Sequence, residues 1–252
     1  MHKIFAKPLF LGKKVDFLPQ CHSTNDELLL LVKNSVVQEG SVIYTDHQLK
    51  GRGQRGNVWF DELGKNVLMS ILLRPKFLSP TKQFYLNLIT GLAIVDVLGE
   101  VLEGKVELKW PNDVYVNDRK IAGILIESNL RGTSLESAVI GIGLNVNQSG
   151  FNMHGATSLS LESGKHHDRF KLMELVVAQL EKWYLKLKGS NYEVILESYH
   201  DLLMWRGELH AFKGVAGTFK GEIVGINQHG NLAINVDGKL QYFGLKEVEF
   251  IN

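Results

Sequence analysis

The residue pattern of the chain changes near Trp205. Beyond that residue, short β-rich runs follow one another and are separated by turn pairs, of which Asp237-Gly238 is the clearest. Asp-Gly between two β-rich runs is among the strongest hairpin signals that a short sequence offers. We therefore expect residues 205–252 to form a small barrel of about five strands and residues 1–204 to form a larger domain, with the boundary near Leu203–Gly207.

The larger part of the chain contains both strand and helix patterns. The clearest β-rich runs are Ser41–Tyr44, Val67–Leu73 and Ala138–Ile142. Apolar residues at steps of three and four predict helices from about Ser79 to Gly104, from Asp168 to Leu187 and from Asn191 to Met204. The first of these is expected to be the longest, with Ser79-Pro80-Thr81 at its start and Gly104 at its end.

Composition narrows the class of protein. Lysine and arginine total 28 against 27 acidic residues, a formal charge of +1, whereas a protein that holds nucleic acid through its phosphates usually has a basic excess. The single cysteine, Cys21, allows no intrachain disulfide, so a reducing compartment is expected. The chain has no run of about 18 apolar residues and no apolar leader at its start. We therefore predict a cytoplasmic protein with no membrane partner.

The first segment that can carry chemistry is Ser23-Thr24-Asn25, just before an apolar stretch. Thr24 and Glu27 fit a capping box, in which the hydroxyl and the carboxylate satisfy backbone N–H groups at a helix start. Alternatively, the same hydroxyls donate to a polar ligand at an exposed helix N-terminus. The two roles can coexist.

The second segment is a glycine-rich basic loop. Gly51, Gly53 and Gly56 prevent regular structure and let backbone N–H groups approach a ligand closely. The cations of the loop are Lys50, Arg52 and Arg55. Charge-assisted hydrogen bonds of this kind suit a phosphate or an acyl-adenylate. The alternatives are a solvated basic loop and an RNA-binding Gly-Arg tract, although such tracts are normally longer.

The third segment reads as a hairpin whose turn is Asn117-Asp118. A two-residue turn places Tyr115 opposite Lys120 and puts Asp113 diagonal to Lys120 on one face, roughly 7–8 Å away. At that separation a carboxylate and an ammonium can reach one ligand without pairing with each other. The alternative is a surface hairpin with ordinary charges.

The fourth segment is Gly141-Ile142-Gly143, followed by Asn145. Gly-x-Gly in a strand predicts a break, in the form of a bulge or a close approach of backbone to a neighbour. Asn145 would hydrogen-bond a nucleotide or cap the end of the strand.

The four segments, in this order and at these spacings, resemble the biotin–protein ligases. The resemblance covers most of the first 150 residues, and the ordered set is far more specific than any one segment. It implies an α+β fold: a catalytic domain like that of class II aminoacyl-tRNA synthetases, with a mixed, mostly antiparallel sheet, in residues 1–204, and an SH3-like β-barrel in residues 205–252. It also implies Mg²⁺-dependent formation of biotinyl-AMP from biotin and ATP, followed by transfer of biotin to a lysine of a biotin carboxyl carrier protein.

The resemblance assigns roles residue by residue. The residues that it places around biotin are Ser23, Thr24, Gln48, Gly51, Arg52, Lys120 and Gly123. Those that it places around the nucleotide are Gly53, Gln54, Arg55, Asn57, Trp59, Lys120 and Asn145. Arg52 would hold the biotin carboxylate and then the adenylate phosphate, and Lys120 would stabilise negative charge in the transition state. Asp113 would orient or deprotonate the incoming lysine.

Two departures from the family pattern matter. Gln54 stands where many members have arginine, so one charge of the loop is lost. Ser23 comes too early to leave room for the N-terminal helix-turn-helix domain of some members, so we expect an enzyme that does not bind DNA. Members include monomers and dimers, and a homodimer is compatible with the sequence. The rival functions are a lipoate or octanoate transferase, which shares the fold but not the Gly51–Gly56 loop, and an RNA-binding module.

Overall fold

The computed structural model describes residues 4–151 and 155–251, and of Arg55 only the backbone. A seven-stranded sheet forms the larger part, with strand order β1-β2-β3-β7-β6-β5-β4. Only β1 and β2 are parallel, and every other neighbouring pair is antiparallel. The strands are β1 (Val15–Leu18), β2 (Val42–Thr45), β3 (Val67–Leu73), β4 (Val106–Lys109), β5 (Asp113–Val116), β6 (Arg119–Arg131) and β7 (Ser134–Leu144).

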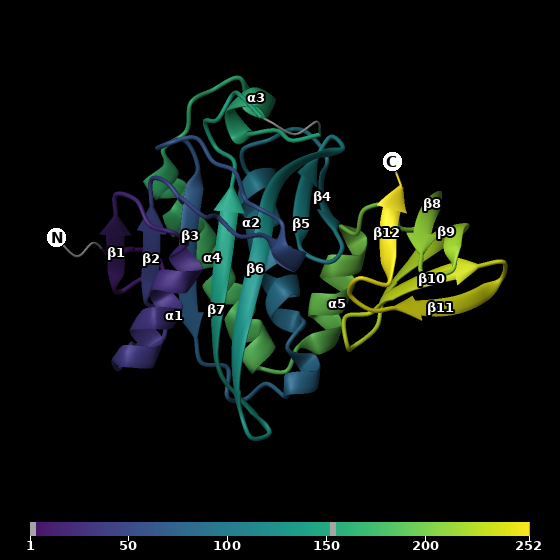
Figure 1. Cartoon of the computed structure of the whole chain (residues 1–252), viewed down its shortest axis with the longest axis horizontal. Coiled ribbons are helices and arrows are strands. Elements are labelled where there is room, and N and C mark those ends of the chain that lie inside the picture. Colours follow the sequence, from purple (N-terminus) through teal and green to yellow (C-terminus); the bar gives the residue numbers. More distant parts are fainter. Residues whose placement is uncertain (1–3, 152–154, 252) are drawn as a thin grey trace.

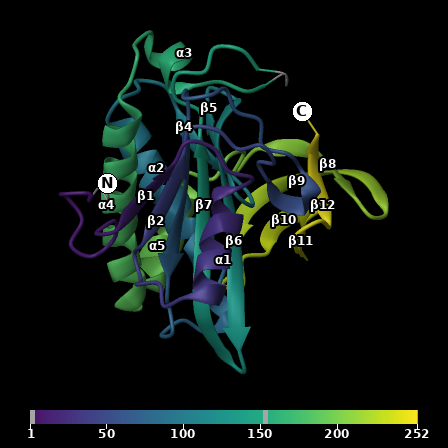
Figure 2. The same cartoon turned by 60° about the vertical axis from the view of Figure 1, so that its left-hand side comes forward.

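Helices cover the sheet on both faces (Figures 1 and 2). Helix α1 (Thr24–Asn34) packs on β2, β3 and β7 from one side. Helices α2 (Tyr85–Gly99) and α4 (Arg169–Lys188) pack on each other and on the opposite face, and α5 (Tyr192–Asp201) lies against α2. Strand β3 is buried along its whole length because it runs between these two layers. The face of the sheet that carries α1 is called the front face. Its part beyond α1, over β7, β6 and β5, carries loops and no α-helix within the described residues.

Three helices lie where the sequence predicted them, and the first is clearly shorter than predicted. A 3₁₀ turn, η2 (Pro80–Lys82), precedes α2, which ends at Gly99 and not at Gly104. The longest helix is α4, with 20 residues against 15 in α2. Asp168 caps α4 by accepting the N–H groups of Phe170 and Lys171. A further short helix, α3 (Leu159–Ser163), connects β7 to α4.

The C-terminal part is a five-stranded antiparallel sheet of order β11-β10-β9-β8-β12, drawn in yellow-green and yellow in Figure 1. Its strands are β8 (Leu209–Gly214), β9 (Gly217–Ile226), β10 (Leu232–Val236), β11 (Lys239–Phe243) and β12 (Val248–Ile251). Asp237 and Gly238 both have positive φ, 50° and 79°, as a two-residue hairpin turn of this hand requires. Five strands and this hairpin are confirmed, while closure of the sheet into a barrel stays a prediction.

The two sheets are joined by polar contacts as well as by apolar packing. Strand β4 is tied to the segment that leads from α5 into the C-terminal sheet, because the Leu108 amide donates to the Leu202 carbonyl and the Met204 amide donates to the Leu108 carbonyl. The indole Nε1 of Trp110 donates to the Gly230 carbonyl, 2.9 Å away. Buried side chains of both sheets belong to one hydrophobic cluster. The turn that follows β4 is therefore held by the C-terminal sheet.

A buried carboxylate fixes the N-terminal segment on the back of the molecule. Glu181 of α4 accepts the backbone N–H groups of Leu9, Phe10 and Leu11 at 2.5–2.8 Å. Two turns earlier on the same helix, the half-buried Glu174 accepts the N–H groups of the exposed Ala6 and Lys7. No helix within the described residues is both long and apolar enough to cross a membrane.

Candidate active site

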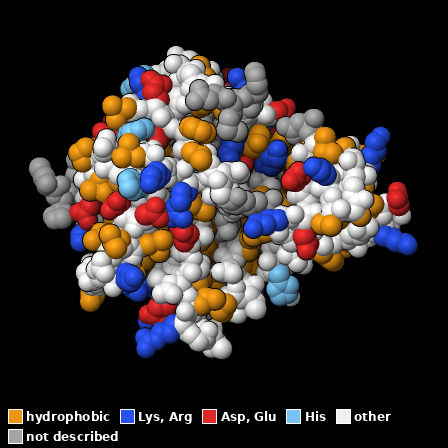
Figure 3. Space-filling view, in the orientation of Figure 1, with side chains coloured by type: hydrophobic (Ala, Val, Ile, Leu, Met, Phe, Trp, Pro, Cys, Tyr) orange, Lys and Arg blue, Asp and Glu red, His pale blue; other side chains and the backbone are white. Residues whose placement is uncertain are grey.

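A cavity of about 780 Å³ opens on the front face of the large sheet, beside the start of α1. Its floor comes from β6 and β7, and its walls come from the glycine-rich loop, the β5–β6 hairpin and the segment after β7. This size lies in the usual range for small-molecule sites. Figure 3 shows basic and acidic side chains interspersed around this face, with no basic stripe of the kind expected for RNA.

Thr24 and Gln48 meet at one wall of the cavity. Helix α1 begins at Thr24, with Ser23 as its N-cap residue, and the Ser23 side chain makes no capping hydrogen bond. The capping-box prediction is therefore wrong, because Thr24 is already the first helical residue. Its N–H instead donates to Gln48 Oε1 at 2.9 Å, and its hydroxyl lies 3.3 Å from the same oxygen. The structure thus brings together Ser23, Thr24 and Gln48, as the ligand-binding alternative requires.

Behind this wall lies a buried polar network that was not found from the sequence. The Ser70 hydroxyl, on β3, lies 2.7 Å from Thr24 Oγ1 and 2.6 Å from Asn25 Oδ1. Asn25 Nδ2 donates to the Leu125 carbonyl and to Glu127 Oε2 at 2.8 Å. A lone hydroxyl within the apolar strand Val67–Leu73 was the one available signal, since a buried polar group needs a partner.

The glycine-rich loop folds back on itself. Arg52 and Val58 form an antiparallel bridge, and the loop turns through η1 (Gln54–Gly56). The Gly53 N–H donates to the Asn57 carbonyl at 2.7 Å, so this amide has a partner within the loop, while Gly53 itself lines the cavity. Gln54 and Asn57 line the cavity, and the Arg55 side chain lies outside the described residues.

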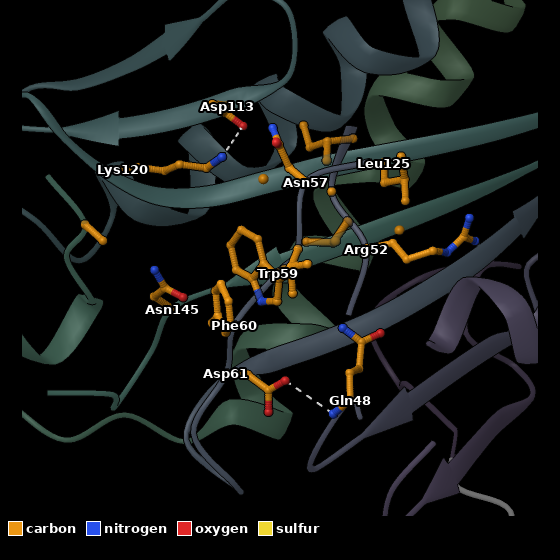
Figure 4. Close-up of a pocket in the computed structure, with 18 of the residues that line it drawn as sticks. Gln48, Arg52, Asn57, Trp59, Phe60, Asp61, Asp113, Lys120, Leu125 and Asn145 are labelled. Atoms are coloured by element: carbon orange, nitrogen blue, oxygen red, sulfur yellow. Dashed lines mark hydrogen bonds and ion pairs between the residues drawn. The ribbon is translucent and has the colours of Figure 1, made fainter. Parts of the chain in front are cut away.

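Arg52 points along the rim, away from Lys120 (Figure 4). Its guanidinium contacts two carboxylates: Glu127 through both nitrogens, at 3.1 and 2.6 Å, and Asp26 at 2.7 Å. The predicted anion-binding arginine is thus already bound to anions of this chain. Sequence inspection missed both partners, which come from β6 and from the first turn of α1.

Trp59 lies on a floor made by two glycines. Gly123 and Gly143 are cross-strand partners on β6 and β7. A Cβ added at Gly143 would stand 2.6 Å from Trp59 Cε2, and one at Gly123 would stand 2.9 Å from Cζ3. The indole Nε1 is buried without a hydrogen-bond partner. The predicted close approach is therefore that of the Trp59 side chain to the glycine backbone. The predicted break is absent, because β7 runs through Gly141 and Gly143 to Leu144.

The β5–β6 hairpin has the predicted turn. Asn117 and Asp118 have φ of 48° and 61°, and Tyr115 lies opposite Lys120. However, Lys120 Nζ lies 2.7 Å from Asp113 Oδ1, so the prediction that the two stay apart is wrong. The register of the hairpin shifts between Val114 and Tyr115, so that Asp113 lies opposite Gly123, and the long lysine side chain reaches the carboxylate from there. The Lys120 backbone also pairs with the segment after β7, donating to the Gly155 carbonyl and accepting from the Thr157 amide.

Asn145 and the charges beside Asp113 complete the site. Asn145 Nδ2 donates to the Thr157 carbonyl at 3.0 Å, so this side chain lines the cavity and also holds the segment after β7 that forms one of its walls.

Burial raises the pKa of Tyr115 to about 12, and the Asp113 charge adds to the effect. Burial lowers the pKa of Lys109, against the opposing effect of Asp113.

Gly141, on β7, allows Asn25 to occupy its place in the network. A Cβ at this position would meet Asn25 Oδ1 well inside van der Waals contact. We expect Gly141→Ala to lower the free energy of unfolding by about 1–3 kcal/mol, because Asn25 is held on both sides and cannot yield. Gly99→Ala, where a Cβ meets nothing within 4 Å, is the matched control. Denaturant unfolding of both variants checks this, and equal stabilities would contradict it.

The chain is similar to known proteins over most of its length. The model of the biotin/lipoate A/B protein ligase family matches residues 17–145. The bifunctional ligase/repressor BirA of Bacillus subtilis (strain 168) is 30% identical over 240 residues, which span 93% of this chain and 72% of that protein. The biotin–[acetyl-CoA-carboxylase] ligase of Paracoccus denitrificans is 28% identical over 241 residues, 92% of this chain and 99% of that one.

Solved structures agree. The biotin protein ligase from Aquifex aeolicus in complex with biotin and ATP superimposes with a TM-score of 0.80 at 29% identity, covering 95% of this chain and 99% of that chain. The matched family residues include the glycine-rich loop, the β5–β6 hairpin and the end of β7, which together surround the cavity. The chain therefore belongs to the biotin/lipoate A/B protein ligase family.

Proposed function

We propose that this protein is a biotin–protein ligase, which forms biotinyl-AMP from biotin and ATP and transfers biotin to a lysine of a biotin carboxyl carrier protein. One observation carries the proposal: residues from all four segments singled out in the sequence line a single cavity. Relatives along nearly the whole chain carry this activity in their names, and one related structure holds biotin and ATP.

In the first step, a carboxylate oxygen of biotin attacks the α-phosphorus of ATP, and pyrophosphate leaves with the electron pair of the broken P–O bond. Thr24 and Gln48 offer hydrogen-bonding groups for the ureido ring at one wall of the cavity. Lys120 is the ammonium that stabilises the negative charge developing between carboxyl and phosphate. A mixed anhydride is readily hydrolysed, so the loop and the indole of Trp59 exclude water from it.

In the second step, the amine of a carrier lysine attacks the acyl carbon, the bond to AMP breaks, and one proton leaves the nitrogen. Asp113, at the cavity edge, orients this amine or accepts the proton. Lys120 pairs with Asp113, with Nζ 2.7 Å from Oδ1. Binding of a phosphate to Lys120 would therefore free the Asp113 carboxylate for the incoming lysine.

The nucleotide is proposed to lie between Trp59 and Asn145, beside Asn57 and Gln54. Magnesium would enter with the phosphates of ATP, as is usual for this ion. Among the described residues, no group of three or more His, Cys, Asp or Glu side chains could hold a metal ion.

The types of the two domains are part of the same proposal. We assign residues 1–204 to a catalytic domain like that of class II aminoacyl-tRNA synthetases and residues 205–252 to an SH3-like barrel. The positive φ of Trp205, 64°, marks a sharp turn of the chain at this boundary. A homodimer, the absence of DNA binding and a cytoplasmic location stay predictions from the sequence.

ATP–pyrophosphate exchange tests the function directly. Purified protein is assayed with magnesium and ATP, adding biotin, lipoate or neither. Exchange that requires biotin supports the proposal, since it reports adenylate formation without a carrier. Exchange with lipoate alone would favour the rival function in lipoate transfer, and no exchange with either acid would contradict the proposal.

The residue at position 54 is expected to set how tightly the adenylate is held. Gln54 lines the cavity at the start of η1. Gln54→Arg restores a charge-assisted hydrogen bond, worth about 1.5–3 kcal/mol against about 1 for a neutral bond. We expect dissociation of biotinyl-AMP to slow roughly tenfold. A chase with unlabelled biotin measures the rate; Gln54→Glu should release the adenylate faster, and equal rates for all three proteins would contradict the prediction.

A further inference from the structure

Arg52 has two carboxylate partners that differ in how firmly they hold it. Glu127, on β6, makes a two-pronged contact with both guanidinium nitrogens, with Nη1 3.1 Å from Oε1 and Nη2 2.6 Å from Oε2. Asp26, in the first turn of α1, makes a single contact with Nη2 at 2.7 Å. Two-pronged arginine–carboxylate pairs are the more strongly oriented of the two kinds.

Glu127 is also supported from behind, whereas the Asp26 carboxylate has no second partner among the described residues. Asn25 Nδ2 donates to Glu127 Oε2, and Asn25 is itself fixed by the Ser70 hydroxyl and the Leu125 carbonyl. The side chain of Glu127 is 29% exposed, against 47% for Asp26. Asp26 can therefore turn into water at little cost, while movement of Glu127 would leave buried partners unsatisfied.

The charge of the cluster opposes a third anion. One guanidinium and two carboxylates sum to a net charge of −1. An anionic group that approaches Arg52 would therefore meet net repulsion as long as both carboxylates stay. Binding of an anion at Arg52 requires one carboxylate to leave, and the single, exposed contact of Asp26 is the weaker one.

We propose that Glu127 is a positioning residue that aims Arg52 at the ligand, and that Asp26 is the partner which the anionic group of the ligand replaces. This inference rests on the proposed function, in which that group is the biotin carboxylate or the adenylate phosphate. The network from Glu127 through Asn25 and Ser70 to Thr24 sets the spacing between Arg52 and the wall proposed for the biotin ring. Substitutions at the two carboxylates must then act in opposite directions.

Equilibrium binding measures both substitutions with two probes. Biotin carries a carboxylate and no phosphate, and biotinol-AMP carries a phosphate and no carboxylate, so the pair shows which anion Arg52 holds. Asp26→Asn is expected to lower the Kd several-fold, since it removes the group that must be displaced. Glu127→Gln is expected to raise the Kd about tenfold, the size of one lost charge-assisted bond. Both effects should shrink when Arg52 is replaced by Ala, because they act through it.

The controls separate position from charge and from folding. Glu27→Gln removes a carboxylate one residue after Asp26, where no contact with Arg52 exists, and should leave both Kd values within about twofold. If Glu127→Gln does not fold, Glu127→Asp keeps the charge but retracts it, and the same rise in Kd is expected. Matching thermal midpoints for the other variants show that folding is intact.

The possible results distinguish a failure of this inference from a failure of the proposed function. Wild-type protein that binds neither probe and shows no biotin-dependent exchange would contradict the proposed function and this inference with it. Wild-type protein that binds biotin, while the two substitutions shift Kd in the same direction or not at all, would overturn this inference alone.

Discussion

Lys120→Ala is expected to lower the rate of biotin-dependent ATP–pyrophosphate exchange by about 10²–10³-fold, the cost of removing one preorganised group that stabilises developing negative charge. Lys120 carries the ammonium that we place at the carboxyl–phosphate junction, and its side chain lies at the cavity in contact with Asp113. Because the interaction belongs to the transition state, the loss should appear in kcat more than in KM for ATP.

Two controls qualify this result. Lys76→Ala removes an exposed lysine that pairs with Glu136 far from the cavity, and should leave exchange unchanged. Lys120→Ala also leaves Asp113 without its partner, so the double variant Lys120→Ala, Asp113→Asn tests whether an unpaired carboxylate, and not the missing ammonium, causes the loss. Recovery of exchange in the double variant, or a loss below about threefold in the single one, would contradict the role of Lys120.

Glu181→Leu is expected to lower the thermal midpoint by roughly 10 °C, given about 2–4 °C per kcal/mol for a chain of this size. The carboxylate accepts three backbone N–H groups, and those of the half-buried Phe10 and the buried Leu11 would have no replacement in the variant. Each buried donor left unsatisfied costs about 1–3 kcal/mol. Calorimetry or far-ultraviolet circular dichroism measures the midpoint.

The same helix provides the matched control. Glu174 makes the same kind of contact with backbone N–H groups, but at exposed residues where water can take its place. Glu174→Leu should therefore shift stability by no more than about 0.5 kcal/mol. Equal losses for the two variants would mean that burial of the donors is not the cause.

Local signals predicted local structure well. The turns at Asn117-Asp118 and Asp237-Gly238 need positive φ at both residues, and few residue types accept it, so both hairpins could be predicted from sequence. The start of α4 at Asp168 was equally clear. The end of α2 was not, because Val101 and Leu102 continue the apolar pattern past Gly99 and a second glycine follows at Gly104.

Contacts made across the fold had no such signal. The partners of Arg52 are Glu127, 75 residues later in the chain, and Asp26, in the first turn of α1, and no local pattern links either carboxylate to the arginine. Thr24 was predicted to cap its helix, but α1 begins one residue earlier than that prediction requires, with Ser23 as the N-cap residue. The pairing of Lys120 with Asp113 depends on the reach of the lysine side chain and on a register shift between Val114 and Tyr115, and no local sequence pattern indicates either.

The position of Trp59 affects what any binding measurement on this protein reports. Its indole already rests on the Gly123–Gly143 floor, with a buried nitrogen that lacks a partner. A ligand that uses this floor must first displace the indole, so the chain supplies its own internal competitor. The measured binding free energy is then the difference between the contact of the ligand with this floor and the contact of the indole with it. A smaller side chain at position 59 would tighten binding of compounds that need only the floor and weaken those that also stack on the indole.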